Sequence, residues 1–160
     1  MAKLITRKMK IGDHISIKKN VFTGMPLEMI EENVKNNVKA MEEGTTNWIY
    51  LVAELEGEVV GTTYVELGQS SVTNHIATLY SVVTSEDHRG KGICRMLFEE
   101  SINQVKDKGV EKIILSVRKG TPAETVYQKM GFTKYGELPN GIKEDDGYYS
   151  DVFYYYDINY

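Results

Sequence analysis

The turn over residues 84–91 constrains the fold more than any other feature of this 160-residue chain. The apolar run Ile76–Val83 leads into the turn and predicts a strand, and Gly90 and Gly92 mark the turn itself. Apolar side chains at helical spacing follow and predict a helix over 92–108. This strand–turn–helix unit must bury the apolar face of its helix against the sheet to which its strand belongs.

Before this unit the chain predicts one long helix and one hairpin. Apolar residues at three- and four-residue steps predict the helix over 26–43. Two β-branched runs, 48–55 and 59–67, predict antiparallel strands joined by a short glycine turn. Residues 2–8 are the candidate for an opening strand, whereas the segment 15–19 is too short and mixed to assign.

After the unit the chain predicts a strand and a capped helix. The segment Lys112–Val117 has the composition of a short buried strand. Thr121 at the N-cap, Pro122 at the first helical position and Glu124 at the third predict a capping box. The helix that it opens is expected to end near Met130.

Two final strands complete the predicted order. They are expected over 132–136 and 151–157, joined by a loop over 138–147 that contains proline, Asn-Gly and three acidic residues. The mixed order of strands and helices predicts an α/β (α+β) three-layer domain. Since 160 residues is about the length of one domain, we expect a single domain over residues 1–160.

Composition and charge narrow the function classes. The formal net charge is −4, and basic side chains are what neutralise phosphates, so we expect no nucleic-acid partner. No stretch approaches the roughly 18 apolar residues of a membrane span, and the chain does not open on an apolar signal segment, so we expect neither membrane insertion nor export. Cys94 is the only cysteine and no Cys/His cluster has zinc spacing, so we expect a cytoplasmic location and no metal.

The glycine turn also has the chemistry of an anion site. A helix start exposes unpaired N–H groups at the positive end of the helix dipole, and glycines let an anion approach the backbone closely. Arg89, Lys91 and Arg95 add positive charge, which suits a ligand with more than one phosphate. From spacing alone, an ordinary glycine-containing turn stays an equal alternative. Known nucleotide loops fit less well, because the chain has no GxxxxGK[ST] and the turn lacks the third Gly or Ala of the dinucleotide fingerprint.

Two blocks of sequence resemble a known family. Residues 79–97, LYSVVTSEDHRGKGICRML, resemble the acetyl-coenzyme A motif of the GNAT superfamily of N-acetyltransferases, Gln/Arg-x-x-Gly-x-Gly/Ala. The match is Arg89-x-x-Gly92-x-Cys94, in which Cys94 departs from the usual Gly or Ala but is still small. Residues 123–132, AETVYQKMGF, are similar to the family's A-x-x-x-Y-x-K-x-G-F helix.

The resemblance implies a fold and a co-substrate. The implied fold is a central mixed, mostly antiparallel sheet of about six to seven strands with helices on both faces. Acetyl-coenzyme A is the implied co-substrate, held between two parallel strands, with direct acetyl transfer to an amine and no metal. The backbone of Val82, Val83 and Thr84 is implied to hold the pantetheine arm and the thioester carbonyl. The residues implied at the pyrophosphate are Arg89, Gly90, Lys91, Gly92, Ile93, Cys94 and Arg95.

Tyr127 matches the tyrosine with which the family protonates the leaving thiolate. A phenol with a pKa of about 10 holds its proton at neutral pH and can deliver it to sulfur. The alternative is a packed aromatic residue on a core-facing stripe with Ala123 and Met130.

The base that deprotonates the amine is less defined. Family members with a carboxylate base on the third core strand would place it near Thr78, and threonine cannot serve. Glu66 and His75 are the candidates, acting directly or through water, and His75 has the suitable intrinsic pKa range. Cys94 as a nucleophile would need a neighbouring base, and small-residue packing is the favoured interpretation.

The acceptor and the partners follow from weaker features. Acidic residues at 144–146 and the tyrosines of the last strand are candidate contacts for a cationic amine, and a small-molecule amine is favoured over a protein. A homodimer stays open, because family members frequently dimerise. The alternative function is a noncatalytic acyl-coenzyme A binding or regulatory module, suggested by Thr78 and Cys94. A weaker third hypothesis is a domain that binds another nucleotide.

Overall fold

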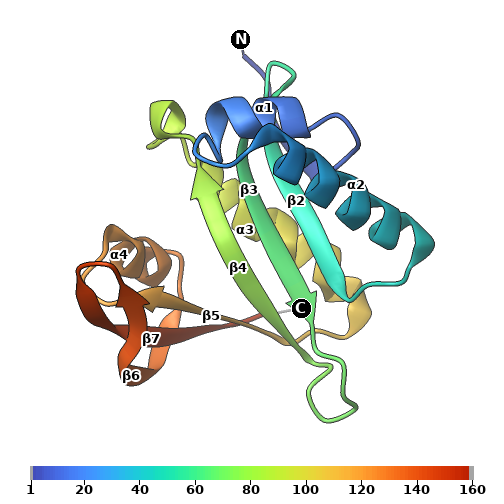
Figure 1. Cartoon of the computed structure of the whole chain (residues 1–160). Helices are drawn as coiled ribbons and strands as arrows, with labels where there is room; N and C mark the ends of the chain where they lie inside the picture. The colour runs from blue at the N-terminus through green and yellow to red at the C-terminus, as the bar shows by residue number, and fades with distance from the viewer. Residues whose placement is uncertain (1, 159–160) are drawn as a thin grey trace.

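The computed structural model describes residues 2–158 and contains one seven-stranded mixed sheet (Figure 1). The strand order is β1-β2-β3-β4-β5-β7-β6, and every neighbouring pair is antiparallel except β4 and β5. This confirms the predicted fold class. The strands are β1 (Leu4–Lys8), β2 (Trp48–Leu55), β3 (Glu58–Leu67), β4 (Ile76–Thr84), β5 (Lys112–Arg118), β6 (Thr133–Glu144) and β7 (Gly147–Asp157).

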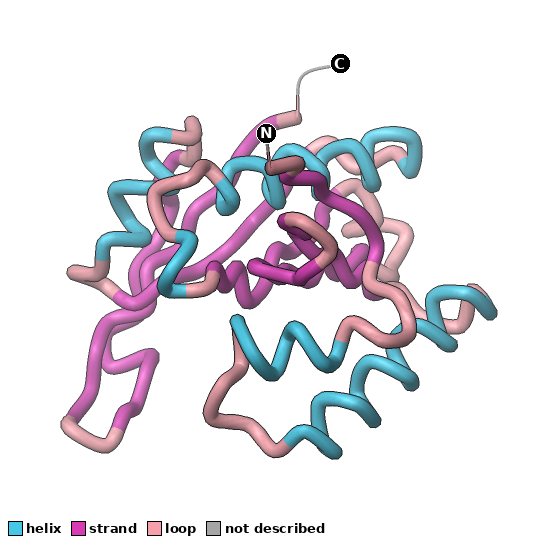
Figure 2. The backbone as a smooth tube through the Cα atoms, turned by 90° about the horizontal axis from the view of Figure 1, so that it is seen from above, coloured by secondary structure: helices cyan, strands magenta, loops and turns pink. Residues whose placement is uncertain are grey.

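Helices cover both faces of the sheet. Figures 1 and 2 show α1 and α2 on one face and α3 on the other. The helices are α1 (His14–Asn20), α2 (Leu27–Glu43), α3 (Ile93–Val105) and α4 (Pro122–Lys129), with short 3-10 turns at Glu86–His88 and Lys106–Lys108. None of the helices within residues 2–158 combines the length and apolar character that crossing a bilayer demands.

The sheet is buried on both faces because its central strands are apolar throughout. Leu51 and Val52 are neighbours in β2 and both are fully buried, yet they belong to different core clusters. Successive side chains of a strand point to opposite faces, so Leu51 packs under α3 and Val52 packs under α1 and α2. Gly61 in β3 lets α3 approach closely, since a Cβ there would lie 2.8 Å from the Cγ2 atom of Ile93.

The parallel strands β4 and β5 pair only at their beginnings. Hydrogen-bonded register runs from Ile76↔Lys112 to Thr78↔Ile114 and then stops, while β4 continues to Thr84. Beyond Thr78 the two strands separate (Figure 1). Ser81, with φ of 49°, lies just beyond this point in β4. The separation leaves the edge of β4 open next to the helices α3 and α4.

Two sequence expectations need correction. The predicted loop over 138–147 is wrong: β6 and β7 pair up to Glu144↔Gly147, and a register shift between Leu138 and Ile142 absorbs Pro139 and Asn140-Gly141. The predicted capping box is also wrong, because the Thr121 hydroxyl donates to the Arg118 carbonyl at 2.8 Å and Glu124 accepts from the Gly120 N–H at 2.8 Å.

The unassigned segment near the N-terminus forms α1. A helix of seven residues is too short to be stable alone, so contacts distant in sequence must hold it. Asp13 is almost fully buried and accepts two hydrogen bonds of 2.8 Å from the Arg7 guanidinium, and Arg7 also contacts Glu54. The opening strand predicted over 2–8 is confirmed as β1.

Candidate active site

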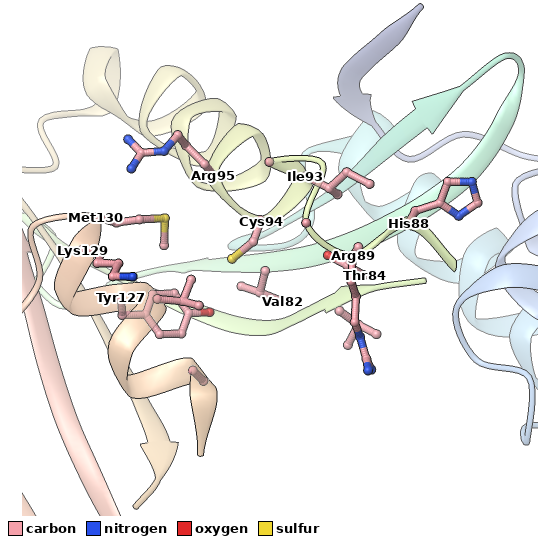
Figure 3. A pocket seen from close by; sticks show the side chains of 15 residues that line it. Val82, Thr84, His88, Arg89, Ile93, Cys94, Arg95, Tyr127, Lys129 and Met130 are labelled. Atoms are coloured by element: carbon pink, nitrogen blue, oxygen red, sulfur yellow. The ribbon is translucent and has the colours of Figure 1, made fainter. Parts of the chain in front are cut away.

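A cavity of about 660 Å³ lies between β4, the start of α3 and α4 (Figure 3). The cavity lies beside the point where β4 and β5 separate, so the unpaired edge of β4 faces the cavity. The predicted cofactor residues that line it are Val82, Val83, Thr84, Arg89, Gly90, Gly92, Ile93, Cys94 and Arg95. Tyr127 joins them from α4, whereas Lys91 does not line the cavity.

The glycine turn forms one end of the cavity. Gly90 and Gly92 both have φ of 77°, a left-handed conformation that favours glycine, and Gly92 is the N-cap of α3. No side chain caps this helix start, so the first N–H groups of α3 are available to a bound anion. Arg89 and Arg95 contribute positive charge to the lining. The turn is therefore built to hold phosphate groups through backbone and cationic side chains.

The Tyr127 hydroxyl lies inside the cavity. The ring is 7% exposed and packs edge-on against Phe132 with centroids 5.4 Å apart. Burial, and then the neighbouring Cys94, raise the pKa of Tyr127 well above its ordinary value, so the phenol stays protonated at neutral pH. Figure 3 shows the Tyr127 hydroxyl and the Cys94 sulfur directed toward the space beside Val82. A protonated donor thus faces the same space as the open edge of β4.

Cys94 is a hydrogen-bonding neighbour of this phenol. Burial is the main reason that the pKa of the Cys94 thiol is raised above its ordinary value, and its hydrogen bond with Tyr127 acts in the opposite direction. A thiol with a raised pKa is protonated at neutral pH and is a weak nucleophile. The geometry thus agrees with Cys94 as a small packing residue beside the acid.

Glu66 and His75 lie in different places. Glu66, on β3, is the cross-strand neighbour of Thr78, the last β4 residue that pairs with β5. His75 precedes β4 at the end opposite to Thr84, and its carbonyl accepts hydrogen bonds from Glu111 and Lys112. The structure therefore brings Glu66, but not His75, next to the separation of β4 and β5. Neither residue lines the cofactor cavity.

Five further residues line the cavity without having been predicted as site residues. These are His88, Ala123, Val126, Lys129 and Met130. Ala123 and Lys129 are the alanine and the lysine of the second family block, and that match was the signal that could have found them. Within residues 2–158, no group of three or more His, Cys, Asp and Glu side chains is arranged to hold a metal ion.

Comparison with known proteins decides the family. The family model described as "Acetyltransferase (GNAT) family" matches residues 24–132, which include both cavity-lining blocks. The chain belongs to the GNAT family of acetyltransferases. Its departure from the family signature at Cys94 therefore occurs within a GNAT domain that keeps the cavity.

Relatives of known sequence and structure agree with this GNAT assignment. The chain is 32% identical over 75 residues to a [Ribosomal protein bS18]-alanine N-acetyltransferase of Haemophilus influenzae. The matched segment covers 43% of this chain and 51% of that relative. The chain thus spans about half the length of this curated relative.

Solved structures share the fold over nearly the whole chain. An acetyltransferase of the GNAT family from Streptococcus pneumoniae superposes with a TM-score of 0.77 at 20% identity, covering 98% of this chain and 100% of that one. YncA from Salmonella typhimurium, solved with its cofactor acetyl-CoA, has a TM-score of 0.78 at 16% identity and covers 98% and 94%. At these identities the likeness shows the fold.

Proposed function

We propose that the protein transfers the acetyl group of acetyl-coenzyme A directly to the primary amine of a small molecule. The observation that carries the proposal is the cavity itself, which has a phosphate-binding turn at one end, an open strand edge along one side and the Tyr127 hydroxyl within it. Acetyl-coenzyme A supplies the reactive thioester when bound there. Its pyrophosphate suits the turn at Gly90–Arg95, and its amide-containing arm suits the unpaired edge of β4.

The backbone of β4 supports the first step of the reaction. Attack of an amine nitrogen on the thioester carbon develops negative charge on the carbonyl oxygen. A fixed backbone N–H at an unpaired strand edge stabilises such charge, because it is already oriented and need not reorganise. The segment Val82–Thr84 has this character, since the β4–β5 pairing stops at Thr78.

Tyr127 is proposed as the general acid. When the C–S bond breaks and the amide C–N bond forms, the departing thiolate requires a proton. The raised pKa of Tyr127 keeps this proton available throughout the neutral range. The buried ring also fixes the position of the hydroxyl.

Glu66 is proposed as the base that takes the proton of the attacking ammonium. Its carboxylate lies beside Thr78, where β4 and β5 begin to separate, on the face opposite to α3. An amine approaching from that face meets Glu66 before it reaches the thioester. The acceptor is proposed to be a small molecule. The Haemophilus influenzae relative is named for acetylation of a ribosomal protein, so a protein N-terminus is the competing acceptor.

The test replaces Tyr127 by Phe, which keeps the packed ring and removes only the hydroxyl. We expect kcat to fall by about 10²- to 10⁴-fold, the usual contribution of a general acid, while the dissociation constant for acetyl-coenzyme A stays the same. The matched control is Tyr154→Phe, because Tyr154 is a buried tyrosine whose hydroxyl contacts Glu124 and Gln128. The control should keep the wild-type kcat.

Two outcomes would contradict the proposal. An unchanged kcat in Tyr127→Phe would show that Tyr127 is only a core residue. Tight cofactor binding without acetyl transfer to any of a broad panel of amines would favour the noncatalytic acyl-coenzyme A module. The homodimer and the cytoplasmic location stay predictions, and light scattering tests the first.

A further inference from the structure

Four aromatic rings form a continuous row on the face of the sheet that carries α1 and α2. They come from three neighbouring strands: Trp48 and Tyr50 from β2, Tyr64 from β3 and Tyr80 from β4. The Trp48 and Tyr80 rings are 5.2 Å apart and the Tyr50 and Tyr64 rings are 5.0 Å apart. Trp48 also stacks on Tyr50 at 6.5 Å and so joins the two pairs.

A carboxylate lies within this row. Glu66 is the cross-strand neighbour of Trp48 on one side and of Thr78 on the other. The Tyr80 hydroxyl donates to its Oε2 atom at 3.2 Å, and the Asn47 amide donates to its Oε1 atom at 3.4 Å. Both partners are uncharged, and no Lys or Arg within residues 2–158 forms an ion pair with Glu66. The negative charge of Glu66 is therefore available to a cation from outside the chain.

The position of the row connects it to the cofactor cavity. Tyr80 lies on β4 between Thr78, where pairing with β5 ends, and Val82, which lines the cavity. Its neighbour Leu79 is buried in the core under α3, so the Tyr80 side chain points to the opposite face. Tyr80 is 41% exposed and is thus accessible to a ligand on that face.

We infer that the acceptor is an arylalkylamine, a primary amine on a short chain with an aromatic ring, bound with its ammonium on Glu66 and its ring against Trp48 and Tyr80. This inference rests on the proposed function and names the substrate class of that site. The aromatic ring of such an amine can stack offset or edge-on against Trp48 and Tyr80. Its ammonium can form an ion pair with the carboxylate and cation–π contacts with the ring faces. In a diamine of similar length, only one ammonium can pair with a carboxylate of the row, because the row contains Glu66 and no second carboxylate.

The chain offers a direct readout, because Trp48 is its only tryptophan. Titration with 2-phenylethylamine should change the Trp48 fluorescence in a saturable way, and 1,4-diaminobutane and alanine amide should bind at least tenfold more weakly in competition. Glu66→Gln should weaken 2-phenylethylamine binding about tenfold, and Tyr80→Ala should weaken it by a similar factor. The controls are Glu58→Gln, at the other end of β3, and Tyr135→Ala, an exposed tyrosine of β6. Both controls should bind as the wild type does.

Equal or tighter binding of the diamine or of alanine amide would overturn the inference, as would unchanged binding in Glu66→Gln. These failures are distinguishable from failure of the proposed function. If acetyl-coenzyme A supports acetylation of the diamine or of alanine amide but not of 2-phenylethylamine, the transferase function stands and the arylalkylamine class falls. If no amine is acetylated, the proposed function itself falls.

Discussion

The two faces of the sheet carry the two proposed ligand sites, and these sites are built in different ways. On the face of α3 and α4, the cavity is built from a contiguous turn, 82–95, and one further helix, so backbone geometry and glycine conformation define it. On the face of α1 and α2, the acceptor row is built from single side chains such as Trp48, Glu66 and Tyr80, which come from three strands. A site formed by the backbone of consecutive residues can thus be found from a local sequence motif. A site formed by side chains from several strands depends on the register of those strands.

The largest expected effect of a single change on the acceptor face is the loss of the Glu66 carboxylate. Glu66→Gln keeps the size of the side chain but removes the proposed base, so kcat/KM should fall by about 10²- to 10⁴-fold. The affinity for acetyl-coenzyme A should not change, because Glu66 does not line the cofactor cavity. Steady-state kinetics and a binding titration on the same protein measure both. A parallel loss of cofactor affinity would show that the two faces are not independent.

The next effect is on stability, and it concerns the Arg7–Asp13 ion pair that holds α1 on the acceptor face. Asp13→Asn removes the buried one of the two carboxylates that contact the Arg7 guanidinium and leaves only Glu54, so we expect the free energy of unfolding to fall by about 2–3 kcal/mol. The exposed pair of Lys19 and Glu58 is the comparison, and Lys19→Gln should cost less than about 1 kcal/mol. Urea denaturation measures both variants. Equal losses would mean that burial of Asp13 adds nothing to its ion pair.

The smallest effect is on stability at alkaline pH. The pKa of Tyr127 is raised by burial, so above about pH 10 an unfolded tyrosine loses its proton while the folded one keeps it. Stability should therefore fall as pH rises above 10, by about 1 kcal/mol at pH 11 from this residue. Tyr127→Phe should remove that part of the fall, whereas Tyr80→Phe, at an exposed position, should remove less. Identical alkaline profiles for Tyr127→Phe and the wild type would contradict the burial argument.

The sequence predicted the strand, turn and helix around the glycine turn for a physical reason. Glycines in a turn, an apolar strand before it and a helix stripe after it are local features, and the structure has the turn with Gly90 and Gly92 in a left-handed conformation. Lys91 was expected at the pyrophosphate from the resemblance but does not line the cavity, because a sequence motif does not say where a side chain points.

The acceptor side and α1 could not be predicted in the same way. The contact between Trp48 and Tyr80 spans β3, so it depends on the register of three strands. The helix α1 depends on Arg7 and Asp13 meeting in the folded chain rather than on its own pattern. The pairing of β6 and β7 within residues 138–147 was missed because this polar, glycine-containing stretch has the composition of a loop, and only pairing across the register shift makes it part of the strands.

The most direct test of the account is calorimetric titration of acetyl-coenzyme A into the wild type, Gly92→Glu and Gly109→Glu. Both glycines have positive φ, 77° and 75°, with open space around the Cβ position, so both variants carry a similar backbone strain of about 1–2 kcal/mol. Only Gly92→Glu places a negative charge at the phosphate turn. The account predicts micromolar binding, about −8 kcal/mol, for the wild type and Gly109→Glu, and its loss in a folded Gly92→Glu. Binding that survives in Gly92→Glu, or its absence in the wild type, would contradict the account.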